Sequence, residues 1–275
     1  MRVILLTTWC VIVATVAELG AQAGQRPIHF IIVFDRTASF WRWMPVAHAV
    51  MAKLFTELRF TLPSSGEDLL TFVELSHKPH IVTQFRGSAA WVKGAEAFLN
   101  NFNEPLPEKG TAIVKTLWTV VEAFNAQPKA FKILLIFSDM HPDPCPPKVA
   151  AWVKDLEEFD WQQLKADEVF VFLWEDQPHF DERGRPYATV LREKFPPLRK
   201  ANFVQPPPLV NGVLERRQLN AFVDQVVGEI MTRVVNRLGA AGDTLIPSWV
   251  IALACLLGFL FLAVAAALAR RGGAS

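Results

Sequence analysis

Three runs dominated by apolar residues constrain the fold of this 275-residue chain more than any other feature. They are IHFIIVF at 28–34, KILLIF at 132–137 and VFVFLW at 169–174. Short runs rich in β-branched and aromatic residues are typical of strands buried on both faces. Stretches with helical character lie between and around them, at 41–59, 88–100, 112–124, 148–164 and 215–238. This alternation predicts an α/β fold: a doubly wound, mostly parallel Rossmann-like sheet with helices on both faces.

Shorter patterns complete the predicted domain. The runs 69–75 and 80–85 are separated by a short HKP turn and predict a hairpin, and 202–204 predicts a last short strand. Residues 177–201 combine several prolines with a dense group of charges at 181–185. We interpret 177–201 as an irregular insertion.

The first residues have the pattern of a secretory signal. An uncharged apolar run at 3–17 follows Arg2, and Ala21 and Ala23 have the A-x-A spacing of a signal peptidase site. Residues 1–23 are therefore predicted to be a signal peptide. The alternative is an uncleaved N-terminal anchor, which the shortness of the apolar run disfavours.

A second apolar run lies near the other end. From Trp249 to Ala269 there is no charge, and 21 helical residues extend about 30 Å, the thickness of one hydrocarbon core. Arg270 and Arg271 follow directly, and such residues favour the cytoplasmic side. We therefore expect a transmembrane helix at 246–269, a cytoplasmic tail at 270–275 and an ectodomain at 24–243. The expected location is the cell membrane, single-pass, with the ectodomain periplasmic or extracellular.

Composition excludes several classes of partner and scaffold. The 28 Lys and Arg residues nearly balance the 27 Asp and Glu residues, which argues against a nucleic-acid-binding protein. Three cysteines are too few for a disulfide scaffold, and Cys145 alone lies between the two apolar ends. The absence of an N-x-[ST] acceptor sequence and of a paired cysteine favours a bacterial envelope over an animal cell surface.

Polar residues follow the first two strand-like runs directly. Asp35, Thr37 and Ser39 are spaced by two after the first run, and Asp139 follows the second. In a loop after a strand, this spacing lets three oxygen-bearing side chains point to one side. Carboxylate and hydroxyl oxygens suit a hard divalent cation, above all Mg²⁺. In parallel sheets, ligands bind outside the carboxyl ends of the strands, where these residues are expected.

These residues carry a resemblance to a known family. The sequence resembles a von Willebrand factor type A domain with a metal ion-dependent adhesion site, whose motif is D-x-S-x-S after the first strand, a Thr in a Gly-Thr loop, and a later Asp. Here the matching residues are Asp35, Thr37 and Ser39 in FDRTAS, Thr111 in KGTAI and Asp139 in IFSDM. The order matches, and the resemblance covers about residues 27–238. One departure is Thr37 in place of Ser, which keeps the oxygen and adds a methyl group.

The resemblance implies a function and a role for each residue. Thr37, Ser39 and Thr111 would offer hydroxyl oxygens to Mg²⁺, with Mn²⁺ or Ca²⁺ as alternatives. Asp35 and Asp139 would act mainly through bound water. The chain would then be a membrane-anchored, metal-dependent adhesion-type module that binds a partner protein through an exposed Asp or Glu. The alternative is a structural subunit of a bacterial envelope complex, in which the site is a scaffold or is degenerate.

Catalytic interpretations lack their key residues. A strand-end Asp also begins haloacid dehalogenase-like phosphatases, but these need a second Asp where this chain has Thr37. Phosphate-binding glycine loops, a G-x-S-x-G elbow and an H-E-x-x-H motif are missing from the sequence. We therefore do not expect an enzyme. Beyond this site, His77 and His80 fit solvated histidines better than metal ligands, and the surroundings of Phe40 to Trp43 fit either a buried helix start or an exposed rim.

Overall fold

The computed structural model describes residues 26–61, 66–87, 90–101, 112–141, 154–157, 159–174, 179–194, 201–206 and 215–242. Residues 26–231 form one compact unit. The last helix, α9 (Arg216–Gly242), begins in this unit and continues as a helix beyond Met231. All the described strands belong to the unit 26–231.

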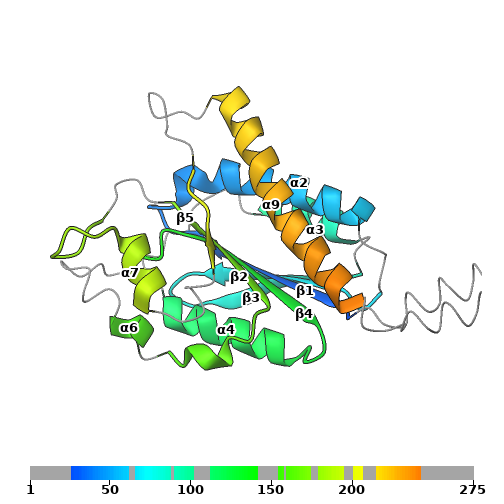
Figure 1. Cartoon of the computed structure of the whole chain (residues 1–275), viewed down its shortest axis with the longest axis horizontal. Coiled ribbons are helices and arrows are strands. Elements are labelled where there is room, and N and C mark those ends of the chain that lie inside the picture. Colours follow the sequence, from blue (N-terminus) through cyan, green and yellow to red (C-terminus); the bar gives the residue numbers. More distant parts are fainter. Residues whose placement is uncertain are drawn as a thin grey trace, which may run out of the picture. The chain divides into compact units, whose positions relative to one another are not determined.

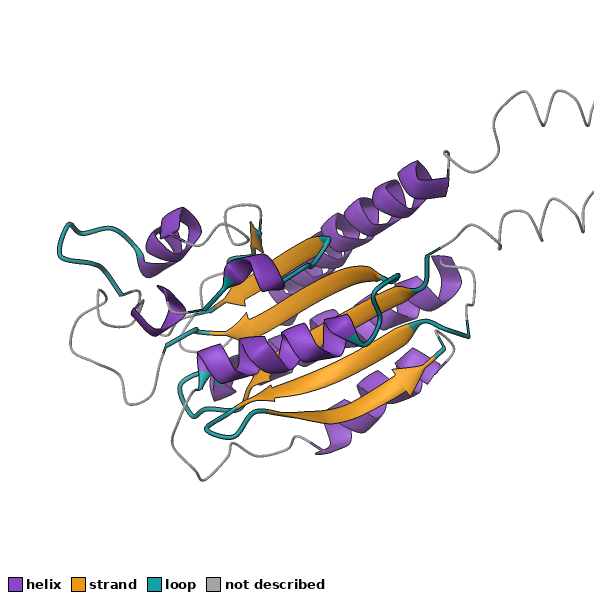
Figure 2. Ribbon diagram, turned by 90° about the horizontal axis from the view of Figure 1, so that it is seen from below, coloured by secondary structure: helices purple, strands orange, loops and turns teal. Residues whose placement is uncertain are grey.

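A six-stranded sheet forms the centre of this unit, and its strands are drawn in orange in Figure 2. The strand order is β3-β2-β1-β4-β5-β6. All neighbouring strands pair in parallel except β2 and β3, which form the predicted antiparallel hairpin. The chain moves outward from β1 to β2 on one side and returns to β4 on the other, so the order reverses between β1 and β4. The strands are β1 (Ile28–Asp35), β2 (Leu69–Leu75), β3 (His80–Arg86), β4 (Phe131–Ser138), β5 (Glu168–Leu173) and β6 (Asn202–Phe203).

Aromatic side chains fill one face of the sheet. Phe30 and Phe34 lie on the same face of β1, and both contact α3 (Trp91–Asn101). The ring centroid of Phe30 is 5.4 Å from that of Trp91, and the ring centroid of Phe34 is 4.1 Å from that of Phe98. The helix α2 (Met44–Thr61) adds Phe55 to this layer, 6.4 Å from Phe30. Figure 1 shows α2 and α3 together on this side of the sheet, with the first part of α9. The period of two along β1 therefore decides which helices each residue meets.

Aliphatic residues dominate the other face. Ile31 and Val33 of β1 join a buried cluster with Leu117 and Val121 of α4 (Ile113–Asn125). The short helices α6 (Lys154–Glu157) and α7 (Tyr187–Lys194) cover the same face nearer β5 (Figure 1). With both faces covered, β1, β2, β4 and β5 are buried along their whole length. The structure confirms the predicted α/β class, with its mostly parallel sheet and helices on both faces.

Two predicted segments differ from the structure. The expected helix at 148–164 is not continuous, because α6 ends at Glu157 and a separate 3₁₀ turn, η3 (Trp161–Gln163), follows. The side chain of Asp160 accepts a hydrogen bond from the N–H of Gln162 and so starts the new turn. The expected irregular insertion at 177–201 is wrong in its second half, where α7 forms. Its apolar residues Tyr187, Val190 and Leu191 pack into the core, which stabilises the helix.

The predictions about the two apolar ends fall outside the described residues. Both the predicted signal peptide at 1–23 and the predicted transmembrane helix at 246–269 lie there. Among the helices that the structure describes, none combines the length and the apolar character needed to cross a membrane.

His29 generates a prediction about pH. It is fully buried on β1, its Nε2 lies 2.9 Å from the Thr71 hydroxyl, and burial together with the charge of Lys132 lowers its pKa from 6.5 to about 4. Between pH 6.5 and 4, the imidazole of His29 therefore binds a proton more readily in the unfolded chain than in the folded chain. We expect the free energy of unfolding to fall by up to about 3 kcal/mol on acidification through this window.

Urea unfolding of the purified chain at a series of pH values tests this. The variant His29→Gln, which cannot titrate, should lose less stability than the wild type between pH 6.5 and 4. It should retain part of the slope, because burial also lowers the pKa of His48 to about 4. The matched control is His77→Gln at an exposed histidine. Equal slopes for His29→Gln and the wild type would contradict the assignment.

Candidate metal centre

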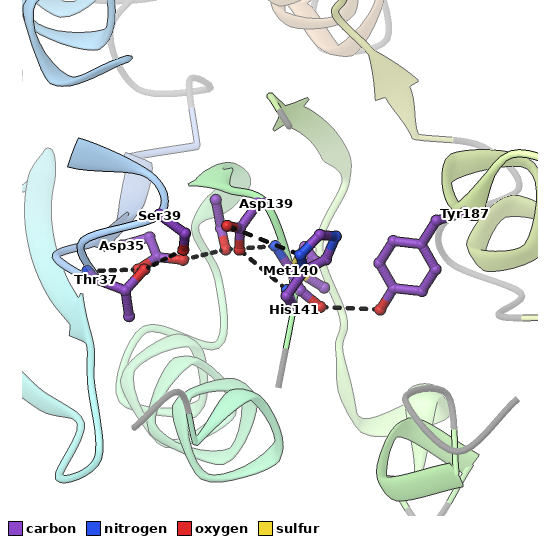
Figure 3. Close-up of polar contacts among 8 residues, drawn as sticks. Asp35, Thr37, Ser39, Asp139, Met140, His141 and Tyr187 are labelled. Atoms are coloured by element: carbon purple, nitrogen blue, oxygen red, sulfur yellow. Dashed lines mark hydrogen bonds and ion pairs between the residues drawn. The ribbon is translucent and has the colours of Figure 1, made fainter. Parts of the chain in front are cut away.

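The candidate site lies at the carboxyl edge of the sheet, where the strand order reverses between β1 and β4. These strands pair in parallel, with Phe34 opposite Phe137. Asp35, the last residue of β1, and Asp139, which directly follows β4, therefore lie side by side at this edge (Figure 3). Ser138 is the last residue of β4. This reversal point is the usual ligand-binding position of such sheets.

The first loop is organised around the carboxylate of Asp35. Its Oδ1 accepts hydrogen bonds from the backbone N–H of Thr37 at 2.8 Å and from the Thr37 hydroxyl at 2.6 Å. The Thr37 and Ser39 hydroxyl oxygens lie 3.1 Å apart. Asp35 is fully buried, Thr37 is half-buried and Ser39 is exposed. The loop thus presents two adjacent hydroxyl oxygens toward solvent and holds the acid behind them.

The second loop meets the first through Ser138. Its hydroxyl donates to Oδ2 of Asp35 at 2.6 Å and accepts from the N–H of Met140 at 2.7 Å. Asp139, which is 3% exposed, accepts a hydrogen bond at Oδ1 from the N–H of His141 at 3.1 Å. Ser138 is not among the site residues predicted from the sequence. Its place directly before the strand-end acid is the signal that could have indicated it.

The two acids influence each other electrostatically. Burial, followed by repulsion from the Asp139 carboxylate, raises the pKa of Asp35 to about 7, although hydrogen bonds from Ser138 and Thr37 act in the opposite direction. Two carboxyl groups held close together in a water-poor place disfavour double ionisation. A divalent cation at this edge would offset their repulsion.

The arrangement of the hydroxyls fits a small divalent cation. Adjacent oxygens of an Mg²⁺ octahedron lie about 2.9 Å apart, because each is about 2.05 Å from the ion. The separation of 3.1 Å between the Thr37 and Ser39 oxygens is close to this edge length. The Thr37 hydroxyl donates its hydrogen bond to Asp35, so a lone pair of the Thr37 oxygen can face a cation. These residues therefore fit a hard cation such as Mg²⁺.

The remaining predicted ligand, Thr111, lies outside the described residues, so the structure does not test its placement. The next residue, Ala112, donates its N–H to the carbonyl of Ser76, just beyond β2, at 3.1 Å. Ala112, the first described residue after Thr111, is thus attached to the same edge of the sheet. Of the five predicted ligands, the structure brings together Asp35, Thr37, Ser39 and Asp139.

Other candidate ligands do not form a competing site. Within the described residues, no group of three or more His, Cys, Asp or Glu side chains is placed to hold a metal ion. His77 lies in the turn between β2 and β3, and His80 is the first residue of β3. Both are exposed, as expected for solvated histidines. Cys145 lies outside the described residues.

The aromatic residues after Ser39 belong to the core. Phe40 is fully buried and Trp43 is 4% exposed. Both rings contact Trp174, at centroid distances of 6.1 and 5.7 Å. The sequence left open whether this stretch is a buried helix start or an exposed rim, and for these two residues the structure shows the buried arrangement. They anchor the loop of Thr37 and Ser39 to the end of β5.

Comparison with solved structures identifies several similar folds. One is BatB, a conserved hypothetical protein from Bacteroides thetaiotaomicron, with 13% identity over 72% of this chain and 97% of that chain and a TM-score of 0.43. A second is a von Willebrand factor type A protein from Catenulispora acidiphila, with 14% identity over 74% and 42% of the two chains and a TM-score of 0.47. A third is proximal thread matrix protein 1 from the mussel byssus, with zinc in its metal ion-dependent adhesion motif, with 16% identity over 74% and 48% of the chains and a TM-score of 0.44.

Sequence comparison adds no further relatives. No family model matches the chain, and no curated protein sequence matches it. The solved structures that the chain resembles in fold thus include a von Willebrand factor type A protein.

The repulsion between the acids generates a prediction about stability. Asp139→Asn removes one negative charge beside buried Asp35 and keeps an oxygen that accepts from the N–H of His141. In the presence of a chelator at pH 8, we expect this variant to be more stable than the wild type by about 1–2 kcal/mol. Saturating Mg²⁺ should stabilise the wild type by linkage and leave the variant unchanged.

Thermal unfolding with chelator and with Mg²⁺ measures both effects. Asp160→Asn is the matched control, because Asp160 also accepts a local backbone hydrogen bond but lies at η3. That control should respond to Mg²⁺ as the wild type does. A variant Asp139→Asn that is destabilised in chelator and still gains stability from Mg²⁺ would show that Asp139 plays no part in a metal site.

Proposed function

We propose that this chain is a metal-dependent, adhesion-type protein-binding module of the von Willebrand factor type A kind. Mg²⁺ would be held by the hydroxyls of Thr37, Ser39 and Thr111, with Asp35 and Asp139 acting through water and orienting these groups. The partner would be a protein that presents an Asp or Glu side chain. The module performs binding and not catalysis.

One observation carries the proposal: two carboxyl groups and two hydroxyls from separate loops converge where the sheet reverses its order. Asp35 and Asp139 are near enough for one to raise the pKa of the other, and Thr37 and Ser39 have hydroxyl oxygens 3.1 Å apart. Turn formation alone explains the hydrogen bonds that Thr37 donates to Asp35. It does not explain why a second buried acid, Asp139, lies close enough to repel the Asp35 carboxylate.

The exposure of the ligand residues supports an open site. The acids are buried while Ser39 is exposed, so the side of the site that faces solvent consists of neutral hydroxyls. A divalent cation held mainly by neutral oxygens stays strongly attractive to anions and keeps exchangeable water. It would supply a binding position for the carboxylate of a partner.

The hydroxyl of Ser39 offers a direct test. Ser39→Ala should lower the affinity for Mg²⁺ by about tenfold or more, because it removes one ligand, and should leave unfolding in chelator nearly unchanged. Thr56→Ala is the control, since it removes an exposed hydroxyl from α2. Calorimetric titration of the purified full-length chain measures the affinities. If the wild type binds no divalent cation at millimolar concentration, the site is degenerate and the alternative of a structural envelope subunit is favoured.

A partner should be held in the same metal-dependent way. Proteins that co-purify with the chain from detergent-solubilised cells in Mg²⁺ should be lost in chelator, and Ser39→Ala should reduce their recovery. Changing the partner's exposed acids to amides one at a time should identify one that abolishes binding. Recovery that is equal with and without Mg²⁺ would indicate a scaffold whose metal site has no binding role.

We further propose that the module faces outside the cytoplasm, anchored by a helix at 246–269. The support is the uncharged run from Trp249 to Ala269 followed by two arginines, together with the signal-like pattern before residue 24. Protease added to intact spheroplasts should degrade the module and leave a cytoplasmic control protein whole. Protection of the module in intact spheroplasts, with digestion after lysis, would overturn this topology.

A further inference from the structure

One peptide group connects the second acid of the site with a distant helix. The N–H of His141 donates to Oδ1 of Asp139 at 3.1 Å, and the carbonyl of Met140 accepts from the hydroxyl of Tyr187 at 2.9 Å (Figure 3). This N–H and this carbonyl belong to the same peptide unit, which is planar and rigid. A hydrogen bond that fixes the carbonyl therefore also fixes the direction of the N–H that holds the carboxylate.

The backbone at this peptide adopts an unusual conformation. Met140 has a φ of +56° and is the one non-glycine residue with positive φ within the described chain. Left-handed backbone is unfavourable for a residue with a side chain and persists where the surroundings enforce it. Here the surroundings include the Ser138 hydroxyl on the N–H of Met140 and the Tyr187 hydroxyl on its carbonyl. The conformation is thus held on both sides.

Tyr187 is itself firmly placed. It is the first residue of α7 and is 1% exposed, and its N–H donates to the carbonyl of His179 at 2.9 Å. Its ring lies 5.4 Å from that of His141. The turn before it is closed by Asp181, whose side chain accepts from the N–H groups of Arg183 and Arg185. The hydroxyl therefore approaches Met140 from a rigid support.

We propose that Tyr187 is a positioning residue for the metal site. Its hydroxyl fixes the Met140–His141 peptide and so holds the Asp139 carboxylate in the direction that metal binding requires. The proposal rests on the proposed function, because it concerns the same site. It adds a residue whose hydroxyl binds the backbone next to Asp139 and which lies 48 positions along the chain from that acid.

A purely structural role for the hydroxyl gives a different expectation. It would satisfy a buried carbonyl, so its removal would lower stability and leave the metal affinity unchanged. If the hydroxyl positions Asp139, its removal lowers the metal affinity more than a substitution elsewhere that costs the same stability. The two roles are therefore separated by comparing the metal affinities of variants that lose similar amounts of stability.

The variant Tyr187→Phe removes the hydroxyl and keeps the ring. In the purified full-length chain, we expect its Mn²⁺ affinity, measured by calorimetry, to fall about three- to tenfold. Trp161→Phe is the control, because the Trp161 ring N–H also donates to a buried backbone carbonyl, that of Leu156, at 2.8 Å. The control should keep the wild-type affinity. Equal affinities for Tyr187→Phe and the wild type would overturn the proposal while leaving the proposed function intact.

A second measurement does not depend on the folding of any variant at position 187. Tyr187 is the only tyrosine of the chain, so incorporation of 3-fluorotyrosine gives a single ¹⁹F resonance. Saturating Mg²⁺ should shift this resonance in the wild type, and Asp139→Asn should abolish the shift. An unchanged resonance in a chain that binds Mg²⁺ would overturn the coupling alone. A wild type that binds neither Mg²⁺ nor Mn²⁺ would overturn the coupling and the proposed function together.

Discussion

The pairing of β1 with β4 is the contact on which the rest of this structure depends. It places Phe34 beside Phe137, with ring centroids 5.0 Å apart, and Phe172 of β5 continues the row at 4.1 Å from Phe137. The residues that follow on β1 and β4 are Asp35, Ser138 and Asp139. The acids thus begin where a tightly packed aromatic layer ends. The burial that stabilises the sheet is also what raises the pKa of Asp35.

Local hydrogen bonds reduce the cost of burying these acids without removing it. Asp35 accepts from the Thr37 N–H, the Thr37 hydroxyl and the Ser138 hydroxyl, and its pKa is still raised. An ordinary structural aspartate with that many donors would have a lowered pKa. The residual cost is understandable if the loops are built for a cation. Perturbed acids of this kind are typical of functional sites.

The sequence predicted the sheet and the meeting of the two loops for a simple reason. Parallel strands buried on both faces leave unbroken apolar runs, and the first polar residue marks where each strand leaves the sheet. That rule placed Asp35 and Asp139 at one edge before any contact was known. It could not place Phe40 and Trp43, because aromatic residues after a loop suit either a core or a rim. Their burial depends on Trp174, which is more than 130 residues away along the chain.

The segment that sequence analysis interpreted least well is the one that supports Asp139. Charges and prolines at 177–201 indicate an irregular segment when only composition is considered. In the structure, these charged residues interact with one another. The side chain of Asp181 accepts a hydrogen bond from the backbone N–H of Arg183 and forms an ion pair with the guanidinium of Arg185 at 2.7 Å. The closed turn fixes the start of α7, and with it Tyr187. In the proposed site, the motif residues would determine which atoms face a metal, while this segment would determine how firmly the second acid is held. A change in the segment would then alter the affinity of the site without altering its ligands.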